Sequence, residues 1–255
     1  MKPPEPILLV ESLFKHYLGP GGARHDILRD VNLRIEESEF VCILGRSGCG
    51  KTTLLRCLAG LEDYGGRILL RGDEVSRPGP DRVMVFQEFN QLLPWKTVAK
   101  NVALPLKVAG ALRSEEINRL TREYLSKVNL WDYRDFYPHQ LSGGMKQRVA
   151  IARSLAMKPK LILMDEPFAS LDAMTRKKLQ AELRQITSEE KTTVVFITHN
   201  IQEALALSSR YLVLNSGGEF LLDKSNPLPK PTTPSTPGFA AAWDEIDSLL
   251  QDPSA

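Results

Sequence analysis

A glycine-rich segment that follows an apolar run could bind a polyphosphate. Residues 45–52 have the sequence Gly-Arg-Ser-Gly-Cys-Gly-Lys-Thr, and the apolar run Phe40–Leu44 precedes them. Glycines in such a turn let several backbone N–H groups converge on one anion, and the helix expected after them adds its positive N-terminal end. Lys51 would neutralise the terminal phosphates and the Thr52 hydroxyl would bind Mg²⁺. The alternative is an ordinary connection between a strand and a helix.

Polar residues that could assist phosphoryl transfer follow three other apolar runs. They are Gln87 after residues 83–86, Asp165 and Glu166 after residues 161–164, and Thr198 and His199 after residues 193–197. Ligands of α/β proteins bind at the carboxyl ends of strands, so Asp165 could hold Mg²⁺ and Glu166 could polarise the attacking water. Gln87 could contact that metal and that water, and His199 could donate a hydrogen bond to the γ-phosphate. The alternatives are that the acids cap the next segment and that His199 is a capping or surface residue.

A second glycine-rich segment opens a helical pattern at residues 141–148, Leu-Ser-Gly-Gly-Met-Lys-Gln-Arg. Ser142 is a suitable N-cap, and the glycines after it leave backbone N–H groups accessible. Val149, Ala152 and Leu155 give this helix an apolar face. The segment is therefore a second candidate anion site, with a plain capped helix as the alternative.

The composition indicates a globular chain with no bias towards nucleic acid or lipid. The 255 residues are 42% hydrophobic and 25% charged, and 33 basic against 31 acidic residues give a net charge of +2. No apolar run has the length of a signal peptide core or approaches the roughly 20 residues that span a bilayer, so we expect a cytosolic chain. The three cysteines form no C-x-x-C pair, which argues against zinc and a disulfide framework. We expect Cys42 and Cys57 in the core and a reactive but non-catalytic thiol at Cys49.

The patterns along the chain predict an α/β fold with a helical insertion. Strands are expected at residues 7–10, 31–35, 67–70, 83–86, 161–164 and 193–197, with a flexible loop at 19–22. Residues 89–157 have helical patterns, including a helix capped by Ser114, and a further helix is expected over 174–189. Near-continuous apolar strands are typical of a parallel sheet covered on both faces. After Asn226 we expect a proline-rich linker and a short helix over 239–251.

Taken in order, these motifs resemble the nucleotide-binding subunit of an ABC transporter over residues 7–225. The resemblance implies the following site residues: Gly45, Ser47, Gly48, Cys49, Gly50, Lys51, Thr52 and Thr53 for ATP; Thr52, Gln87 and Asp165 for Mg²⁺; Glu166, His199 and Gln87 for catalysis; the signature Leu141, Ser142, Gly143, Gly144 and Met145; and the D-loop Ser170, Leu171 and Asp172. It also implies that Tyr17 stacks on adenine, with Phe14 as the alternative. Met145 stands where the usual signature has glutamine, which removes the side-chain contact expected from that position.

The implied fold is a P-loop NTPase core with a mostly parallel sheet, an N-terminal antiparallel β subdomain and a helical signature subdomain. We expect residues 1–225 to form the ATPase domain, with the helical subdomain at about 89–157, and residues 226–255 to form a tail. The resemblance also implies a homodimer, or a pair with another ATPase subunit, that holds ATP at its interface.

Three segments, residues 86–98, 137–140 and 167–172, resemble the ATPases of nitrate, sulfonate and taurine importers. The implied function is ATP hydrolysis at the inner face of the cell membrane, driving uptake of a small oxyanion through separate permease subunits. A solute-binding protein would act indirectly, and no nucleic acid is expected. Sulfonates are favoured over nitrate because the chain has one cassette and no appended solute-binding domain. The alternatives are a non-transport ABC-type ATPase and a nucleotide-dependent regulatory module.

Overall fold

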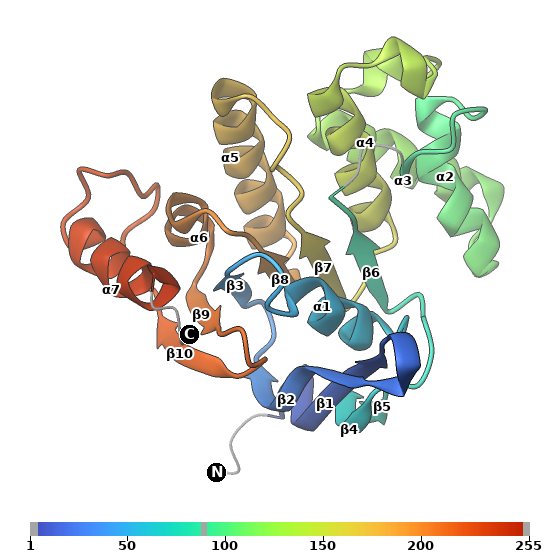
Figure 1. Ribbon diagram of the computed structural model, residues 1–255. Coiled ribbons are helices and arrows are strands. Elements are labelled where there is room, and N and C mark those ends of the chain that lie inside the picture. Colours follow the sequence, from blue (N-terminus) through green and yellow to red (C-terminus); the bar gives the residue numbers. More distant parts are fainter. Residues whose placement is uncertain (1–4, 88–90, 252–255) are drawn as a thin grey trace. The chain divides into compact units, whose positions relative to one another are not determined.

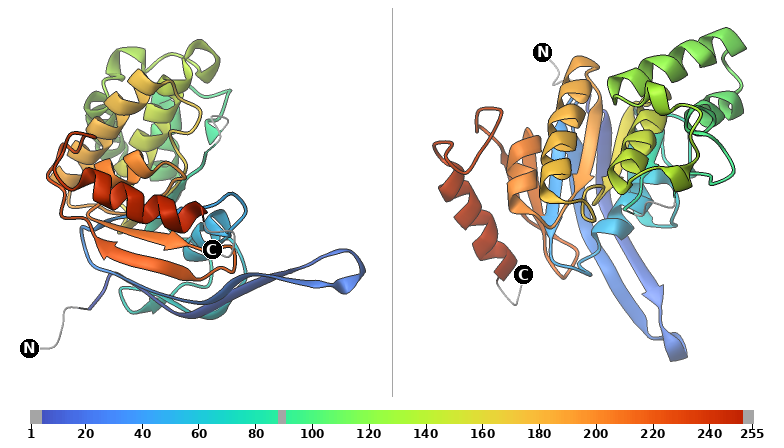
Figure 2. Two further views of the ribbon diagram at one scale, coloured as in Figure 1. Left: turned by 60° about the vertical axis from the view of Figure 1, so that its left-hand side comes forward. Right: turned by 90° about the horizontal axis from the view of Figure 1, so that it is seen from above.

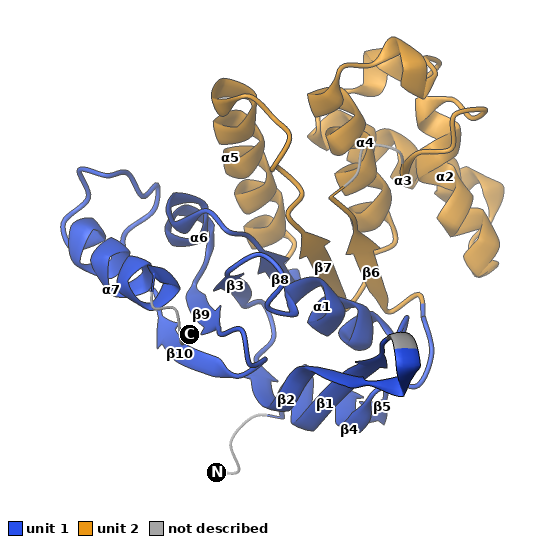
Figure 3. Ribbon diagram, in the orientation of Figure 1, with its two compact units in different colours: residues 1–79, 191–255 blue, residues 80–190 orange. Residues whose placement is uncertain are grey.

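The computed structural model describes residues 5–87 and 91–251. The chain forms two compact units (Figure 3), in which unit 1 comprises Met1–Gly79 and Lys191–Ala255 and unit 2 comprises Pro80–Glu190. Residues 88–90, part of the stretch that resembles oxyanion importers, lie outside the described residues.

Unit 1 contains an antiparallel sheet built from the N-terminal part of the chain. In spatial order its strands are β2 (Arg24–Ile35), β1 (Leu8–Leu18), β4 (Gly65–Leu70) and β5 (Asp73–Glu74). Val31, Leu33 and Ile35 alternate with exposed residues along β2, as expected for a strand with one buried face. The expected antiparallel subdomain is therefore present, and its strands are longer than the apolar patterns indicated.

The hairpin of β1 and β2 shows why the pattern underestimated these strands. The two strands pair from Leu8, opposite Ile35, to Leu18, opposite Arg24. Towards the Leu18 end, side chains on both faces of the hairpin are in contact with solvent, so buried and exposed residues no longer alternate. Gly19 N–H donates to the carbonyl of Ala23 at 2.8 Å and closes the turn. The result is one long hairpin that extends from unit 1 (Figure 2), not two short strands joined by a flexible loop.

A parallel arrangement of strands forms the core of unit 1. The strands are β3 (Phe40–Gly45), β8 (Thr193–Ile197), β9 (Arg210–Leu214) and β10 (Phe220–Ser225). β3 lies between β8 and β9 and is parallel to both, while β10 pairs with β9 in the antiparallel direction. Every residue of β3 and β8 is buried, which matches the near-continuous apolar runs.

The α-helices in the described part of unit 1 (Figure 1) are α1 (Lys51–Ala59), α6 (Ile201–Leu207) and α7 (Phe239–Gln251). α1 buries Leu54, Leu55 and Leu58, and α6 packs against β3. α1 itself packs against β2 and β3, directly after the C-terminal end of β3.

The proline-rich segment after Asn226 packs against the rest of unit 1, to which it belongs. The Asn226 side-chain amide donates to the carbonyls of Leu205 and Ser208, both at 3.0 Å. Phe239 and Ile246 of α7 are buried, and α7 packs against α6 and β9. The expected short helix spans Phe239–Gln251, but the segment before it is held by side chains and is no free linker.

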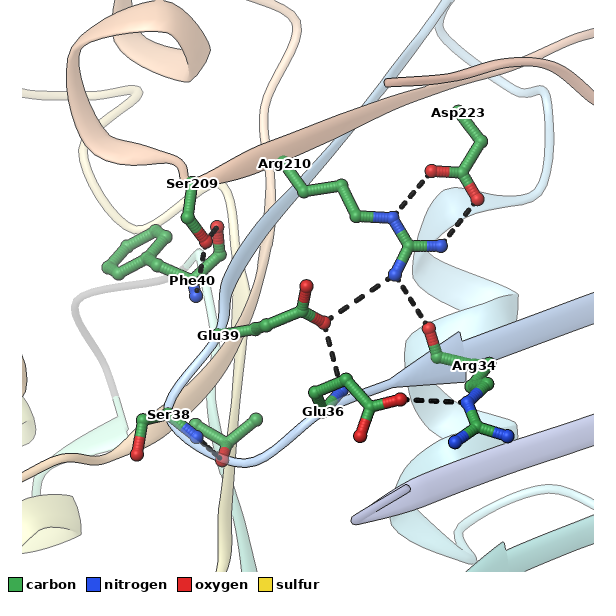
Figure 4. Close-up of polar contacts among 9 residues, drawn as sticks. Arg34, Glu36, Ser38, Glu39, Phe40, Ser209, Arg210 and Asp223 are labelled. Carbon is green, nitrogen blue, oxygen red and sulfur yellow. Dashed lines mark hydrogen bonds and ion pairs between the residues drawn. The ribbon is translucent and has the colours of Figure 1, made fainter. Parts of the chain in front are cut away.

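One arginine joins the two sheets of unit 1 (Figure 4). Arg210 at the start of β9 contacts both carboxylate oxygens of Asp223 on β10. Its Nη1 also donates to the carbonyl of Arg34 at 2.7 Å and lies 3.5 Å from Glu39. Glu39 in turn accepts from the backbone N–H of Glu36 at 2.9 Å. Arg210 thus fastens the end of β2, and the turn after it, to the parallel strands.

Unit 2 contains two parallel strands and four α-helices. The elements are β6 (Arg82–Val85), α2 (Val98–Ala109), α3 (Ser114–Lys127), α4 (Gly143–Ala156), β7 (Leu161–Asp165) and α5 (Ala173–Glu189), with 3-10 turns η3 (Trp131–Tyr133) and η4 (Pro138–Gln140). β6 and β7 pair in parallel, with Val85 opposite Met164. α5 buries Leu179, Leu183 and Ile186, the three residues expected to face inward.

Helix α3 begins one residue earlier than its sequence suggested. The apolar face is as expected, with Ile117, Leu120 and Tyr124 buried. The N-cap is Arg113, however, and no side chain caps the helix; Ser114 is the first helical residue. The acidic residues of the first turn favour this helix end even without a cap, because they interact with the helix dipole.

Candidate functional site

The turn between β3 and α1 has the backbone of an anion-binding loop. Gly48 and Gly50 have φ values of +85° and +101°, a region that residues with a Cβ rarely adopt. Gly50 is the N-cap of α1 and provides no side chain, so the first turn of the helix keeps backbone N–H groups directed at the loop. Gly45 is required for a different reason: a Cβ there would lie 2.6 Å from Cys49 Sγ and 2.7 Å from the Leu214 carbonyl.

Lys51 directs its ammonium group into this loop. Its Nζ donates to the carbonyls of Gly45 and Arg46, both at 2.8 Å, and the residue is only 6% exposed. A buried ammonium held by neutral carbonyls is well placed to exchange one of them for a phosphate oxygen, which is a stronger, charge-assisted partner. Ser47 is exposed in the middle of the loop, and Thr52 and Thr53 lie in the first turn of α1.

Cys49 is enclosed by the loop that it belongs to. It is 3% exposed, and its Sγ lies 3.9 Å from Lys51 Nζ. Burial raises the pKa of the Cys49 thiol more than the neighbouring ammonium lowers it. The thiol is therefore kept protonated, contrary to the expectation of a reactive group.

The two candidates for adenine stacking differ in their surroundings. The ring of Phe14 lies across Gly65 of β4, where a Cβ would come within 1.9 Å of Phe14 Cζ. The ring of Tyr17 is 38% exposed, and Lys15 Nζ lies 4.8 Å from its centroid. Phe14 packs part of its ring on the sheet but is 45% exposed, so exposure does not separate the two candidates.

His199 follows the strand adjacent to the loop-bearing strand. The backbone N–H of Thr198 donates to the Ile43 carbonyl of β3 at 3.2 Å, which continues the pairing of β8 with β3 up to His199. The Thr198 hydroxyl donates to the buried Glu203 carboxylate at 2.5 Å and accepts from the backbone N–H of Asn200 at 3.0 Å. The Thr198–Glu203 pair holds the turn that contains the exposed His199. The sequence motifs did not predict this pair.

In unit 2, the acidic pair and the glutamine lie at the same end of two paired strands. Asp165 ends β7 and is 6% exposed, and Gln87 follows the end of β6, the parallel neighbour of β7. Glu166 has a φ of +42°, in the left-handed region that non-glycine residues seldom occupy. Backbone strain of this kind gathers at functional sites, where the surrounding contacts maintain it.

The signature segment forms the capped helix start that its sequence predicted. The Ser142 hydroxyl accepts from the backbone N–H of Met145 at 3.3 Å, and α4 begins at Gly143. Gly144 faces the first turn of α5, since a Cβ there would lie 2.7 Å from Thr175 Cγ2. Leu141, which precedes the cap, is buried and anchors the segment.

Asp172 is the N-cap of α5. Its Oδ1 accepts from the backbone N–H groups of Met174 at 3.1 Å and Thr175 at 3.0 Å. Hydrogen bonds from Thr175, chiefly from its backbone, lower the pKa of the Asp172 carboxyl group. Ser170 is exposed and Leu171 is buried in the turn before this cap.

The structure therefore assembles two sets of site residues, one in each unit. Unit 1 brings the glycine-rich loop and His199 to adjacent strands, and unit 2 brings Gln87 beside Asp165 and the signature helix beside α5. Within the described residues, no group of three or more His, Cys, Asp or Glu side chains could hold a metal by itself. No helix among the described residues is long and apolar enough to cross a membrane.

The motifs did not reveal the importance of Asn101 or of Arg176. The buried Asn101 side chain accepts from Leu93 N–H at 2.8 Å and donates to the carbonyls of Leu93, Lys96 and Thr97 at 3.0–3.2 Å. Arg176 makes a comparable set of contacts to backbone carbonyls before α5. An asparagine or arginine in a helical pattern is otherwise indistinguishable from a solvated one.

Comparison with known proteins places these features in a large family. Residues 28–169 match a family model described as ABC transporter. An uncharacterized ABC transporter ATP-binding protein of Methanocaldococcus jannaschii is 50% identical over 211 residues, which are 82% of this chain and 78% of that protein. The bicarbonate transport ATP-binding protein CmpD of Synechococcus elongatus is 43% identical over 89% of this chain and 82% of its own length.

The nitrate import ATP-binding protein NrtC of the same organism is 43% identical over 96% of this chain, but the chain spans only 38% of that longer protein. Among solved structures, a dimeric ATP-binding cassette in a post-hydrolysis state, bound to ADP and Pi, is 35% identical. It matches with a TM-score of 0.76 over 86% of this chain and 98% of the solved one.

Proposed function

We propose a function from the premise that this chain belongs to the ABC transporter family. The chain is an ATP-binding ABC-type ATPase, and we infer that it is the subunit that powers import of a small oxyanion through a separate permease. The buried ammonium of Lys51 inside a loop closed by left-handed glycines is the observation that carries ATP binding. We retain residues 1–225 as the ATPase domain, with a helical subdomain at about 89–157.

The chemistry assigned to the site is in-line attack of water on the γ-phosphate. Lys51 would bind the β- and γ-phosphates, and Glu166 would orient the attacking water. His199 would donate to the charge that develops on the γ-phosphate. The left-handed backbone at Glu166 is compatible with this role, because the contacts around a functional site can maintain such strain.

Mg²⁺ would bind through oxygen atoms of this chain and of the nucleotide. The candidates are the Thr52 hydroxyl, the Asp165 carboxylate and the Gln87 amide oxygen. Hard oxygen donors of this kind suit Mg²⁺, which is usually held by one or two carboxylates together with substrate phosphates. When bound, the ion would neutralise charge on the phosphates.

A second copy of the chain, or a related ATPase subunit, would complete each nucleotide site. Each chain has two glycine-rich anion sites, the loop at Lys51 and the capped signature helix at Ser142, and one polyphosphate occupies only the first. Two-fold pairing would place the signature of one copy over the ATP of the other. The solved cassette that matches this chain is described as dimeric, which supports this arrangement.

An exposed aromatic segment in unit 2 is proposed to meet the permease. Trp95 is 69% exposed, so it is no core aromatic, and Asn101 fixes the backbone on both sides of it. Tyr133 and Phe136, also exposed, form an edge-to-face pair with centroids 5.3 Å apart. The Phe136 carbonyl accepts from Val98 N–H at 2.8 Å, so this pair lies beside the start of α2. Exposed aromatic groups on a rigid frame are typical of a protein interface.

The relatives' names favour nitrate or bicarbonate over the sulfonates that sequence reasoning preferred. Both are small oxyanions, in line with the proposed solute class. Deleting the gene should impair growth when nitrate is the sole nitrogen source or when bicarbonate is scarce. Normal growth on these and on sulfonates and taurine, with a defect on an amino acid or a pyrimidine precursor, would reject the oxyanion proposal. Co-purification of an integral membrane protein would separate the importer from a non-transport ATPase or a regulatory module.

Glu166→Gln tests the catalytic assignment. The substitution keeps the size of the side chain and its hydrogen bonding but removes the carboxylate, so turnover should fall by about two to four orders of magnitude. ATP binding should persist, and ATP should trap a dimer detectable by size-exclusion chromatography. Glu189→Gln, an exposed position on α5, is the matched control and should hydrolyse ATP normally. Normal turnover in Glu166→Gln would show that Glu166 is only structural.

A further inference from the structure

A single arginine side chain holds the turn between Glu166 and Asp172 in unit 2. Arg176 Nε donates to the Phe168 carbonyl at 3.2 Å, and its Nη2 donates to the Leu171 carbonyl at 2.7 Å. A longer contact of 3.5 Å joins Nη2 to the Ala169 carbonyl. The planar guanidinium presents its donors in fixed directions, so it can bind several carbonyls of one turn at once.

These contacts extend to the two ends of the turn. At the start, the Glu166 carbonyl accepts from Ala169 N–H at 3.2 Å, and the Ala169 carbonyl is one of the groups that face Arg176. At the end, the backbone N–H of Arg176 donates to the Asp172 carbonyl at 2.9 Å. The side chain and the backbone of Arg176 therefore hold the path from Phe168 to Asp172, and the hydrogen bond from Ala169 N–H links this path to Glu166.

We propose that Arg176 is a positioning residue for ATP hydrolysis: by holding this turn it keeps Glu166 in its left-handed backbone conformation and Asp172 at the start of α5. The inference rests on the proposed function, in which Glu166 orients the attacking water. A strained φ of +42° relaxes unless its surroundings maintain it, and the hydrogen-bonded turn supplies that restraint.

The signature segment packs directly on the same region. Asp172 caps α5 through Thr175 N–H, and a Cβ on Gly144 would meet Thr175 Cγ2 at 2.7 Å. Thr175 is the neighbour of Arg176 in the chain. Loosening the turn would therefore disturb both Glu166 and the support of the signature helix, two parts proposed to act in turnover.

Lys51 does not depend on this turn for its position. Its ammonium is held by the carbonyls of Gly45 and Arg46 in its own loop. Loss of the Arg176 contacts should therefore slow hydrolysis while leaving the affinity for ATP intact. A purely structural arginine would give no such separation, because partial unfolding lowers binding and turnover together.

The test compares Arg176→Met and Arg176→Lys with Lys177→Met in the full-length chain. Methionine keeps the length and apolar stem without donors, and lysine keeps the charge without the planar fork. Lys177 is the next residue of α5 and is exposed, so its substitution is a matched loss of charge. We expect kcat for ATP to fall at least tenfold in Arg176→Met and at least threefold in Arg176→Lys. The Kd for ATP should stay within twofold in both, and Lys177→Met should match the natural chain.

Hydrogen–deuterium exchange of residues 167–172 provides the second measurement. The N–H groups of Ala169 and Leu171 donate within the turn, so their exchange should accelerate at least threefold in Arg176→Lys. A kcat for Arg176→Met equal to that of Lys177→Met, a Kd that rises in proportion to the loss of kcat, or unchanged exchange would each overturn the proposal. If Arg176→Met does not fold, Arg176→Lys is judged by the same measures.

Glu166→Gln, assayed in parallel, separates this inference from the function on which it rests. Normal hydrolysis by Glu166→Gln would overturn the catalytic assignment and, with it, the role of Arg176. Lost hydrolysis in Glu166→Gln together with normal hydrolysis in Arg176→Met would overturn the role of Arg176 alone.

Discussion

Removing the Arg210 guanidinium should destabilise unit 1 by an amount that its contacts allow us to estimate. Arg210→Met keeps most of the stem and deletes the contacts to Asp223, Glu39 and the Arg34 carbonyl (Figure 4). The hydrogen bond with Asp223 raises the pKa of Arg210, so the group is charged at any working pH. The Arg210 side chain is 19% exposed, and that of Asp223 is 43% exposed.

The contacts of the Arg210 guanidinium to the Arg34 carbonyl and to Glu39 should dominate the loss, because the Arg210 side chain is only 19% exposed. A hydrogen bond from a charged group contributes about 1.5–3 kcal/mol, and the exposure of the Arg34 carbonyl contact places this contribution at the lower end of the range. The Asp223 pair is screened by water because Asp223 is well exposed, and it should contribute only about 0.2–1 kcal/mol. We therefore expect a loss of about 2 kcal/mol for Arg210→Met and below about 1 kcal/mol for Asp223→Asn.

Thermal and urea unfolding followed by circular dichroism would measure these losses. In a chain of this size, about 2 kcal/mol corresponds to a fall in Tm of about 4–8 °C. Arg29→Met is the matched control, because Arg29 lies on β2, the strand that Arg210 contacts, but its side chain is 58% exposed and its Nε is 3.9 Å from Asp26. Equal losses for Arg210→Met and Arg29→Met would refute the estimate. A loss for Asp223→Asn as large as that for Arg210→Met would show that the carboxylate, and not the carbonyl, is the main partner.

Three further outcomes are expected. Lys51→Ala should weaken ATP binding by about 1.5–3 kcal/mol in a fluorescence titration without unfolding the chain, and unchanged affinity would reject the phosphate-binding role. Because the folded-state pKa of Asp172 is lowered, its carboxylate stabilises the fold above the unfolded pKa of about 3.9, and this contribution is lost as the pH falls through the folded pKa. Asp172→Asn should therefore lower the unfolding midpoint at pH 7, and the difference from the natural chain should shrink in acid; a difference independent of pH would contradict this. Iodoacetamide should label Cys49 more slowly in the folded chain at pH 7.5 than in urea, since burial raises its pKa, and equal rates by mass spectrometry would be the contrary result.

Features that depend on a few consecutive residues could be derived from the sequence. The turn at residues 45–52 needs a left-handed backbone at Gly48 and Gly50. Glycine adopts this conformation without help from tertiary contacts, so the turn could be derived from the residues alone. Asp165 follows four apolar residues, so its place at the end of a buried strand followed from the pattern. The capped start of α4 at Ser142 is equally local.

Other features depended on which segments meet in three dimensions. Arg210 lies 176 residues from Arg34 and 171 residues from Glu39, and no periodicity connects such partners. In the sequence, Arg176 and Asn101 look like any solvated polar residue of a helix. Their side chains bind backbone carbonyls only because the neighbouring turns pass close to them in the folded chain. The exposure of Trp95 was equally undetermined, because an aromatic residue between Pro94 and Lys96 fits a core and a surface alike.

The end of the chain shows the same division. A short helix was expected over residues 239–251, and it spans Phe239–Gln251, because the tendency of a segment to form a helix depends largely on its own residues. Whether the prolines before it would form a free linker depended on surfaces elsewhere in the chain. The Asn226 side-chain amide donates hydrogen bonds to the carbonyls of Leu205 and Ser208, and α7 packs against α6 and β9. A sequence determines the local conformation that its residues favour, whereas the partners of its buried polar groups exist only once distant segments have packed together.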